Sequence, residues 1–451
     1  MTRADRYPIH RRDLLRAATA AAVPWVVPAA ALGTPGRRPP SDRITLGFIG
    51  VGMMGRGHLA RFLRYPQAQV LAVCEVDRWR RENAQNTANQ AYAAERAGGA
   101  YRGCAAYNDF RELLARDDVD AVVVSTGDRW HAAHTVLAAR AGKDIFCEKP
   151  ISLTIAEARA MVEAVRRYGR IFQTGLQQRS AREFRLACQL VREGALGKVD
   201  RVYAIFPGTS SEVDLPAEPV PEGLDWDLWL GPAPWRPFNS RFHHYGAPQH
   251  VVPWEFCRDF GGGALTSGAV HALDVVQWGL DKDHTGPVEV VPPATGEVPA
   301  LTYRYADGTV LQVVEGRLDP RRHDVPRGWD EITSIQPFGA LFVGEQGWIH
   351  VGRQGYLTSS PAEIVEDHPG RYDHGIAVAG HHQNWLDSIA TRRRTACDVD
   401  VGCQSTIVAH LGCIAQWTGR ALKWDPEGEV FLGDDEANRM RRRAMRAPWQ
   451  V

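Results

Sequence analysis

Short apolar runs alternate with longer amphipathic segments through the first part of the chain. The apolar runs are continuous and rich in β-branched residues, which predicts buried strands over residues 44–49, 70–74, 121–125, 144–147 and 171–174. The segments between them predict helices over residues 53–63, 83–96, 110–116, 131–141 and 155–168. This alternation is typical of an α/β fold in which a doubly wound parallel sheet is covered by helices on both faces.

The pattern changes after about residue 175. A helix is expected over residues 181–193, and strands that alternate apolar and polar positions are expected over residues 199–205, 301–305, 310–314, 342–343 and 348–351. These strands predict a second α/β domain with an open, mainly antiparallel sheet, followed by a late helix over residues 381–391. Between residues 207 and 255 lies a long stretch rich in Pro and Trp, and ordered loops of that length are usually functional. The predicted domains are therefore residues 43–174 and 175–451.

The first residues have the three zones of an export signal. Arg11 and Arg12 form a twin-arginine pair, residues 17–27 are apolar, and residues 29–31 offer a small-residue cleavage site. The apolar stretch is short of the roughly 20 residues that span a bilayer. We therefore expect a twin-arginine signal peptide at residues 1–33 and a linker at residues 34–42, with export by the Tat translocase to the periplasm or cell envelope.

Charge and cysteine usage exclude several classes of function. The 451 residues contain 53 Lys and Arg and 53 Asp and Glu, so the formal net charge is +0 and nothing attracts a phosphate backbone or an anionic membrane. None of the eight cysteines forms a Cys-x-x-Cys pair, and the adjacent His243 and His244 are poorly placed to ligate one ion together with His271. We expect no nucleic-acid partner and no metal.

A glycine-rich turn between the first strand and helix predicts a dinucleotide site. Gly50-Val51-Gly52-Met53-Met54-Gly55 has the spacing that lets backbone approach a pyrophosphate at a helix N-terminus. Glu75 follows the second strand, where a carboxylate accepts from ribose hydroxyls and repels a 2′-phosphate, so NAD is favoured over NADP. Further contacts to the cofactor are expected from residues after the third and fourth strands, namely Ser125, Thr126, Trp130, His131, Glu148 and Lys149. Because nucleotides are scarce outside the cytoplasm, an exported protein is expected to hold its cofactor tightly.

Two further segments carry candidate chemistry. Lys149, in the run Glu148-Lys149-Pro150, is one of only five lysines, and a lysine can be shifted toward a neutral pKa where an arginine cannot. His271 follows the glycine run 261–263 and is a natural proton acceptor for an alcohol, with Asp274 on the same helix face. Candidate substrate contacts at the start of the second domain and in the Trp-rich stretch are Gln177, Arg179, His243, His244 and Tyr245.

These motifs together resemble the Gfo/Idh/MocA oxidoreductase family over about residues 43–430, and the late Asn384-Trp385 and Trp424-Asp425-Pro426 segments resemble its twin-arginine-exported branch. The resemblance implies a Rossmann domain, a second α/β domain that often mediates homo-oligomers, and Lys149 and His271 as catalytic residues acting on a sugar or cyclitol hydroxyl. The family usually has aspartate where this chain has Ser267, which is expected in the substrate site. Either Asp274 or Glu148 compensates, or the chemistry is altered.

Three functions follow from this interpretation. The leading one is an exported NAD-dependent oxidoreductase that oxidises a carbohydrate or polyol. The second is a glycosidase of the kind found in one exported branch, in which NAD transiently oxidises C3 and elimination cleaves the glycosidic bond. The third is a nucleotide-binding protein with weak catalysis, suggested by Ser267.

Overall fold

The computed structural model describes residues 42–245, 254–330, 332–368 and 380–451. The expected signal peptide at residues 1–33 and all but the end of the linker at residues 34–42 lie outside this part of the chain. Among the described residues, no helix combines the length and the apolar character needed to cross a bilayer.

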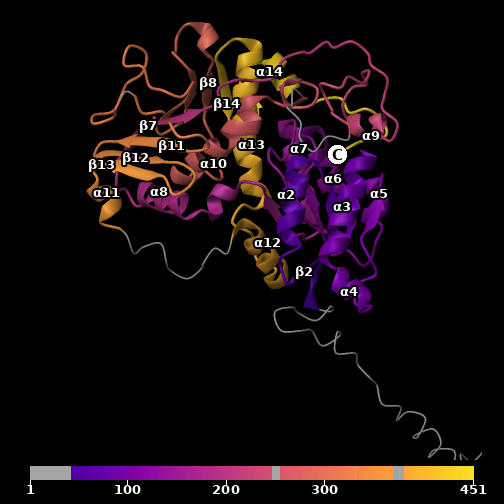
Figure 1. Cartoon of the computed structure of the whole chain (residues 1–451). Coiled ribbons are helices and arrows are strands. Elements are labelled where there is room, and N and C mark those ends of the chain that lie inside the picture. The colour runs from indigo at the N-terminus through magenta and orange to yellow at the C-terminus, as the bar shows by residue number, and fades with distance from the viewer. Residues whose placement is uncertain (1–41, 246–253, 331, 369–379) are drawn as a thin grey trace, which may run out of the picture.

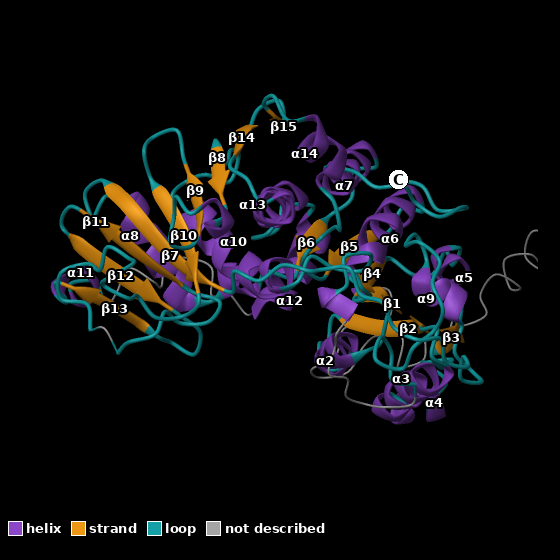
Figure 2. Cartoon of the chain, turned by 90° about the horizontal axis from the view of Figure 1, so that it is seen from above, coloured by secondary structure: helices purple, strands orange, loops and turns teal. Residues whose placement is uncertain are grey.

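The N-terminal domain is built on a parallel sheet (Figures 1 and 2). Its six described strands are β1 (Ile44–Ile49), β2 (Ala68–Cys74), β3 (Ala105–Tyr107), β4 (Ala121–Val124), β5 (Asp144–Cys147) and β6 (Phe172–Thr174). They lie in the order β3-β2-β1-β4-β5-β6, and every pairing is parallel. This is the strand order of a Rossmann fold, whose crevice lies where the connections reverse direction between β1 and β4.

Helices cover both faces of this sheet, as its continuous apolar strands require. They are α2 (Met53–Phe62), α3 (Arg78–Ala91), α4 (Ala93–Ala97), α5 (Phe110–Leu114), α6 (Asp128–Arg140) and α7 (Ile155–Arg167). Several begin at a capping side chain: Asp77 accepts from the amide of Arg80, and Thr154 accepts from the amide of Glu157. The first turn of α2 has no such side-chain cap, because its N-cap residue is Gly52.

The second domain contains a nine-stranded sheet. Its described strands are β7 (Val199–Ile205), β8 (Glu289–Val291), β9 (Leu301–Arg304), β10 (Val310–Val314), β11 (Ala340–Gly344), β12 (Gly347–Val351), β13 (Leu357–Ser360), β14 (Leu422–Asp425) and β15 (Val430–Phe431). They lie in the order β13-β12-β11-β7-β10-β9-β8-β14-β15, and the pairings are antiparallel except between β7 and β10. The predicted α/β fold class is therefore confirmed, with a parallel sheet in one domain and a mainly antiparallel sheet in the other.

Helical segments connect and cover this second sheet. They are η3 (Gln177–Ser180), α8 (Arg182–Arg192), α9 (Trp226–Leu230), η4 (Trp254–Phe256), the π-helix η5 (Leu265–Ala269), α10 (Val270–Gly279), η6 (Pro293–Thr295), α11 (Glu363–Glu366), α12 (Gly380–Thr391), α13 (Val399–Thr418) and α14 (Asp435–Met440). Helix α13 runs along the junction of the two domains (Figure 1) and contacts both α7 and α10.

The chain returns to the N-terminal domain near its end. Trp385 and Leu386 of α12 belong to the apolar core beneath the parallel sheet. Trp449 packs against Phe110 and Trp130, with ring centroids 5.8 and 4.7 Å away. The second domain is therefore not a simple C-terminal half, because residues after 380 complete the first domain.

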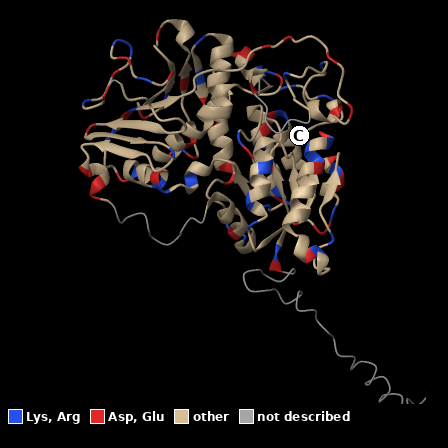
Figure 3. Cartoon of the chain, viewed as in Figure 1, with Lys and Arg blue, Asp and Glu red and all other residues tan. Residues whose placement is uncertain are grey.

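Acidic and basic residues are interspersed along the chain in both domains (Figure 3). Two of the basic residues near the C-terminus form ion pairs within the molecule. Arg443 contacts Glu157 at 2.5 Å and Arg446 contacts Asp227 at 2.5 Å. These pairs tie the C-terminal segment to α7 and to the Trp-rich segment.

Candidate functional site

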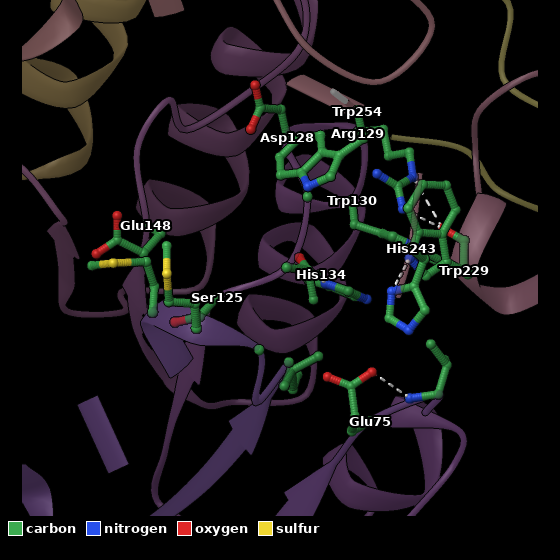
Figure 4. Close-up of a pocket in the computed structure, with 18 of the residues that line it drawn as sticks. Glu75, Ser125, Asp128, Arg129, Trp130, His134, Glu148, Trp229, His243 and Trp254 are labelled. Carbon is green, nitrogen blue, oxygen red and sulfur yellow. Dashed lines mark hydrogen bonds between the residues drawn. The ribbon is translucent and has the colours of Figure 1, made fainter. Parts of the chain in front are cut away.

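A cavity of about 330 Å³ lies at the carboxyl ends of the parallel strands. Figure 4 shows Ser125 and Glu148 on one side of it, Trp229 and His243 on the other, and Glu75 below. The cavity is long, since its walls reach from the glycine turn and Glu75 at one end to Lys149 and Ser267 at the other. We call these the nucleotide end and the lysine end.

The glycine turn has the close packing that its sequence requires. Gly50 has a φ of +86°, and a Cβ there would lie 2.7 Å from the carbonyl oxygen of Ser125. A Cβ on Gly55 would lie 2.2 Å from the carbonyl oxygen of Gly50. Without a side-chain cap, the amides of the first turn of α2, at Met53, Met54 and Gly55, are available to an anion. Met53 and Met54 also line the cavity.

Glu75 is held rigidly at the end of β2. Its Oε2 accepts from the amide of Val51 at 3.0 Å, and its Oε1 accepts from the amides of Val76 and Asp77 at 2.8 and 3.2 Å. The carboxylate thus faces the cavity with a fixed orientation and still has lone pairs for hydroxyl groups. Arg80 also lines this end, but its Nη2 donates to the carbonyl oxygen of His244 at 3.0 Å.

Residues 206–245, which we call the insert, fold back over the nucleotide end. The indole of Trp130 donates to the carbonyl oxygen of Leu228 at 2.9 Å, and Arg129 donates through Nη2 to the carbonyl oxygen of Trp229 at 2.6 Å. His243 contacts the Asp77 carboxylate at 3.0 Å. The insert is therefore fastened to α3 and α6 of the other domain, and it covers the crevice.

Trp130 forms the aromatic floor of this region. It stacks on His134, with centroids 4.5 Å apart and planes at 4°. Gly231 of the insert, with a φ of +56°, lies so close that a Cβ there would be 2.1 Å from the Trp130 ring. Burial and the charges of His131 and Arg129 hold the pKa of His134 well below its usual value, so this ring is neutral.

At the lysine end, Lys149 is held by main chain instead of a carboxylate. Its Nζ donates to the carbonyl oxygen of Ser267 at 2.7 Å. Ser267 lies in the π-helix η5, and such wide turns are often found at functional sites because they turn a residue out of the helical register. Here the π-helix brings Ser267 to the cavity wall.

Two carboxyl groups that the sequence did not single out also line the lysine end, Asp128 and Glu255. Burial raises the pKa of Asp128 to about 8 despite the opposing charge of Lys149, and its Oδ2 has no hydrogen-bond partner. Burial also raises the pKa of Glu255, but Lys149 and a hydrogen bond with the Ser267 hydroxyl oppose that rise.

Glu148 is connected to a buried pair of histidines. Its Oε1 accepts from His58 Nε2 at 2.8 Å, which leaves His58 Nδ1 to accept from His382 Nε2 at 2.8 Å. Burial acts to raise the pKa of Glu148, but the hydrogen bond from His58 and the charge of Lys149 lower it to about 2. The charged Glu148 also accepts from the amide of Lys149 at 3.2 Å, which fixes the turn that carries the lysine.

His271 is buried beside this site but is not among the residues that line the cavity. Arg353 orients the neighbouring amide of Gln178, because its Nε and Nη2 both donate to Gln178 Oε1 at 2.9 Å. Gln178 Nε2 then donates to His271 Nδ1 at 2.8 Å. The neutral His271 ring therefore carries its proton on Nε2. Burial and the charges of Lys149 and Arg353 hold its pKa well below the usual value.

Several predicted site residues do not line the cavity and are bonded to other parts of the protein. Asp274 is fully buried, and both of its oxygens accept from Arg179 Nε at 2.9 and 3.0 Å. Arg179 also pairs with Asp283, so its guanidinium is saturated by carboxylates. This ion-pair network joins η3 to α10 away from the cavity. His131 is also buried and bonds through Nδ1 to the carbonyl oxygen of Pro150 at 2.7 Å, behind the lysine turn.

The remaining predicted substrate residues are divided between the two ends. Gln177 and His244 are exposed, and neither is part of the cavity wall. Tyr245 lies against Gly223 of the insert. His243 lines the nucleotide end, where its Nδ1 accepts from the indole of Trp229 at 3.1 Å. Of the predicted substrate residues, only His243 and Ser267 border the cavity, at opposite ends.

Two models of one protein family match the chain. The NAD-binding Rossmann-fold model of the Gfo/Idh/MocA oxidoreductases matches residues 44–176. The C-terminal alpha/beta-domain model of the same family matches residues 206–323 and 376–451. The chain belongs to the Gfo/Idh/MocA oxidoreductase family. The second match skips part of the sheet and resumes at α12, in agreement with the return of the chain to the N-terminal domain.

Relatives within the Gfo/Idh/MocA family carry several activities. The chain is 28% identical to 1,5-anhydro-D-fructose reductase of Ensifer adhaerens over 54% of this chain and 58% of that protein. It is 30% identical to inositol 2-dehydrogenase of Salmonella typhimurium, over 53% and 55%. It is also 30% identical to a glycosyl hydrolase family 109 protein of Shewanella pealeana, over 36% and 34%. The chain thus spans a third to somewhat more than half of the length of these relatives.

Solved structures of similar fold include levoglucosan dehydrogenase in complex with NADH and levoglucosan. That structure has a TM-score of 0.54 and 17% identity, over 87% of this chain and 100% of that one. The WlbA dehydrogenase of Bordetella pertussis, in complex with NADH and UDP-GlcNAcA, has a TM-score of 0.53 and 16% identity, over 85% and 98%. At this identity, the likeness establishes the fold alone.

The cavity fits the dinucleotide that the Gfo/Idh/MocA fold binds. The Oγ of Ser125 is buried at its wall without a hydrogen-bond partner, as expected of a group that awaits a ligand. The uncapped α2 terminus suits a pyrophosphate, and Glu75 suits a ribose. No group of three or more His, Cys, Asp or Glu within the described residues is arranged to hold a metal ion.

Proposed function

We propose that this protein is an NAD-dependent oxidoreductase that transfers hydride between a sugar or polyol CH–OH group and a tightly held nicotinamide cofactor. The supporting observation is the single cavity that joins the glycine turn and Glu75 to the ammonium group of Lys149. Relatives named as an inositol dehydrogenase and an anhydrofructose reductase support a polyhydroxylated substrate.

Glu75 supports NAD over NADP. Its carboxylate is fixed by three backbone amides and cannot turn away, so a 2′-phosphate placed there meets an unrelieved negative charge. Arg80 lies near, but it is engaged by the carbonyl oxygen of His244 and lies 3.5 Å from the Asp77 carboxylate.

The insert supports tight retention. Its contacts through Leu228, Trp229 and His243 hold it against the nucleotide end of the cavity, where it would slow the release of a bound nucleotide. Acid-quenching the purified full chain and identifying the released nucleotide tests this. Protein that copurifies with no nucleotide and exchanges added NAD within seconds would contradict retention.

In the mechanism, Lys149 binds and orients the reacting hydroxyl. Its Nζ has three N–H bonds and donates one to the Ser267 carbonyl, so others remain for a substrate oxygen. The ammonium stabilises negative charge as the hydroxyl loses its proton. NAD supplies hydride acceptance when bound.

Substitution of Lys149 tests this role. Lys149→Met keeps the length of the side chain but removes the donor, and we expect kcat to fall at least about 100-fold while NAD affinity changes less than threefold. The assay measures NADH formation with myo-inositol, levoglucosan and common aldoses. Lys198→Met is a control at a lysine that does not line the cavity. A wild type inactive toward every polyol and sugar, or an active Lys149→Met variant, would overturn the proposal.

A glycosidase is the second candidate, favoured by a specific observation. Asp128, with a pKa of about 8, is protonated at neutral pH and is placed to give a proton to a leaving-group oxygen. The glycosyl hydrolase family 109 relative points the same way. Cleavage of nitrophenyl glycosides that requires NAD but forms no net NADH would select this function. Absence of cleavage across α- and β-anomers would exclude it.

We further propose that residues 1–33 direct export by the Tat translocase. The support is the Arg11-Arg12 pair followed by an apolar stretch and small residues. Cell fractionation of a tagged full chain tests it, with Arg11→Lys/Arg12→Lys as the matched variant. The wild type is expected in the periplasm and the variant in the cytoplasm. Equal distribution of the two would contradict export by this route.

A further inference from the structure

The lysine end holds the ammonium group of Lys149 and three carboxyl groups, Asp128, Glu148 and Glu255. One of these carboxyl groups could act as a base in place of the aspartate of the family pattern. We propose that Glu255 is the proton acceptor of this site and performs the part of the aspartate that Ser267 replaces. The inference rests on the proposed oxidoreductase function. It is carried by the positions of Glu255, Lys149 and Ser267 on one cavity wall.

Ser267 is hydrogen-bonded to the lysine of this site. Its carbonyl oxygen accepts from Lys149 Nζ at 2.7 Å, and Ser267, Lys149 and Glu255 all line the same cavity. An aspartate at position 267 would put its own carboxylate where the serine hydroxyl lies. The smaller serine instead leaves room for a carboxylate from a different segment, η4, which lines the same cavity as the lysine.

The glycine run 261–263 fixes the main chain of Glu255. The amide of Gly263 donates to the carbonyl oxygen of Glu255 at 2.8 Å. A Cβ on Gly261 would lie 2.6 Å from that same oxygen, so only glycine allows this approach. The glycine run therefore also fastens η4 to the N-terminal end of η5.

Asp128 also lines the lysine end, but it has a different protonation state. Burial raises its pKa to about 8, so near neutral pH it is a neutral acid. Burial raises the pKa of the half-buried Glu255, but Lys149 and Ser267 oppose this rise by stabilising its charged form. Arg129 lies beside Asp128 but is engaged by the carbonyl oxygen of Trp229. Glu148 is also charged, but its pKa of about 2 makes it a weak base and its Oε1 already accepts from His58, so Glu255 is the carboxylate suited to take a proton.

His271 is not prepared to accept the proton. The amide of Gln178, oriented by Arg353, occupies Nδ1, and Nε2 already carries a proton. Its burial among Lys149 and Arg353 further disfavours a second positive charge. In this arrangement, His271 is a hydrogen-bond donor.

Oxidation of the substrate hydroxyl needs only the substrate, NAD⁺ and the Glu255 carboxylate. The substrate O–H bond breaks and its proton moves to a carboxylate oxygen of Glu255. The C–H bond breaks with its electron pair, which leaves as hydride to NAD⁺, and the carbon–oxygen bond becomes a carbonyl. The products are a ketone or lactone, NADH and neutral Glu255. Because Glu255 is partly exposed, it returns its proton to water.

The first test does not require a known substrate. NAD⁺ carries a positive ring and NADH does not, so an ionised carboxylate in the cavity favours NAD⁺. Dissociation constants of both nucleotides are measured by fluorescence of Trp229 and Trp254, which line the cavity. We expect Glu255→Gln to lower the preference for NAD⁺ over NADH about tenfold, the scale of one partly buried unit charge. Glu212→Gln, an exposed position in the insert, is the matched control and should equal wild type.

The second test moves the carboxylate. Glu255→Gln/Ser267→Asp places the charge at the position of the family's aspartate, and we expect it to regain most of the NAD⁺ preference that Glu255→Gln loses. Ser267→Asp alone should bind NAD⁺ but turn over more slowly than wild type, because a fourth carboxyl group then competes for Lys149. A general base contributes about 10²–10⁴-fold, so Glu255→Gln should lower kcat at least about 100-fold.

The outcomes separate this inference from the proposed function. A Glu255→Gln variant with the wild-type NAD⁺ preference, or with turnover within twofold of wild type, overturns the role of Glu255. Loss of preference that the double variant does not regain also counts against it, provided that its melting temperature matches the wild type. A wild type that binds neither nucleotide overturns the proposed function itself.

Discussion

The bond between His58 and Glu148 gives a prediction that the structure allows to be quantified. The pKa of Glu148 lies at about 2 instead of its usual 4.5, so contacts to its charged form contribute on the order of 3 kcal/mol. His58 is the partner that donates directly, at 2.8 Å, and a hydrogen bond to a buried charged group is worth about 2 kcal/mol. Substitution His58→Phe keeps an aromatic ring but removes both ring nitrogens. It leaves Glu148 without its donor and His382 without its acceptor.

The expected effect is a lower melting temperature. For a chain of this length, about 2 kcal/mol corresponds to a fall of about 2–3 °C. Differential scanning fluorimetry at pH 7 compares wild type and His58→Phe with His58→Gln, whose amide can still donate to Glu148 and should lose less than about 1 °C. Because the pKa of Glu148 is depressed in the folded state, the stabilisation is complete above pH 4.5 and is lost as pH falls toward 2. The gap between wild type and His58→Phe should therefore narrow below pH 4.5. A variant as stable as wild type at pH 7, or a gap that widens in acid, would refute the reasoning.

Three other perturbations have defined outcomes. Gly231→Ala should raise the dissociation constant for NAD at least about tenfold, since its Cβ would enter the Trp130 ring. A fluorescence titration that gives the wild-type dissociation constant would contradict this. Glu75→Gln should raise NADP affinity relative to NAD about tenfold, because one negative charge beside the ribose is removed; equal ratios of the two dissociation constants in variant and wild type would exclude it. Trp449→Ala should lower the melting temperature by about 3–4 °C through the gap left against Phe110, whereas Trp449→Phe should lose less than half of that.

The parallel sheet could be predicted from sequence because its signals are local. Each strand is a short continuous apolar run, and the glycine turn at residues 50–55 marks where the first strand ends and α2 begins. Helix α13 could not be predicted in this way. It is buried around almost its whole circumference, so its apolar residues do not repeat with the helical period of 3.6. Its sequence therefore indicates a buried segment but does not distinguish a helix from a strand.

The site was predictable at the nucleotide end and only in part at the lysine end. Lys149 follows a strand and is recognisable from its position. Glu255 is brought beside it by tertiary packing, which no spacing in the sequence encodes. Asp128 had a signal, since it opens the helix that follows the third strand of the expected fold. The sequence placed Asp274 on the same helix face as His271. It could not show that the Asp274 carboxylate is bound by the guanidinium of Arg179.

The packing of α12 and Trp449 on the first domain has a consequence for protein engineering. Nucleotide-binding modules are often exchanged between enzymes at the boundary that the strand count suggests, here near residue 174. A graft of residues 43–174 alone would expose the aromatic surface around Phe62 and Phe146 that Trp385 covers, and the ring of Phe110 that Trp449 covers. A functional chimera of this protein therefore has to carry two transplanted pieces, the second taken from the far end of the chain.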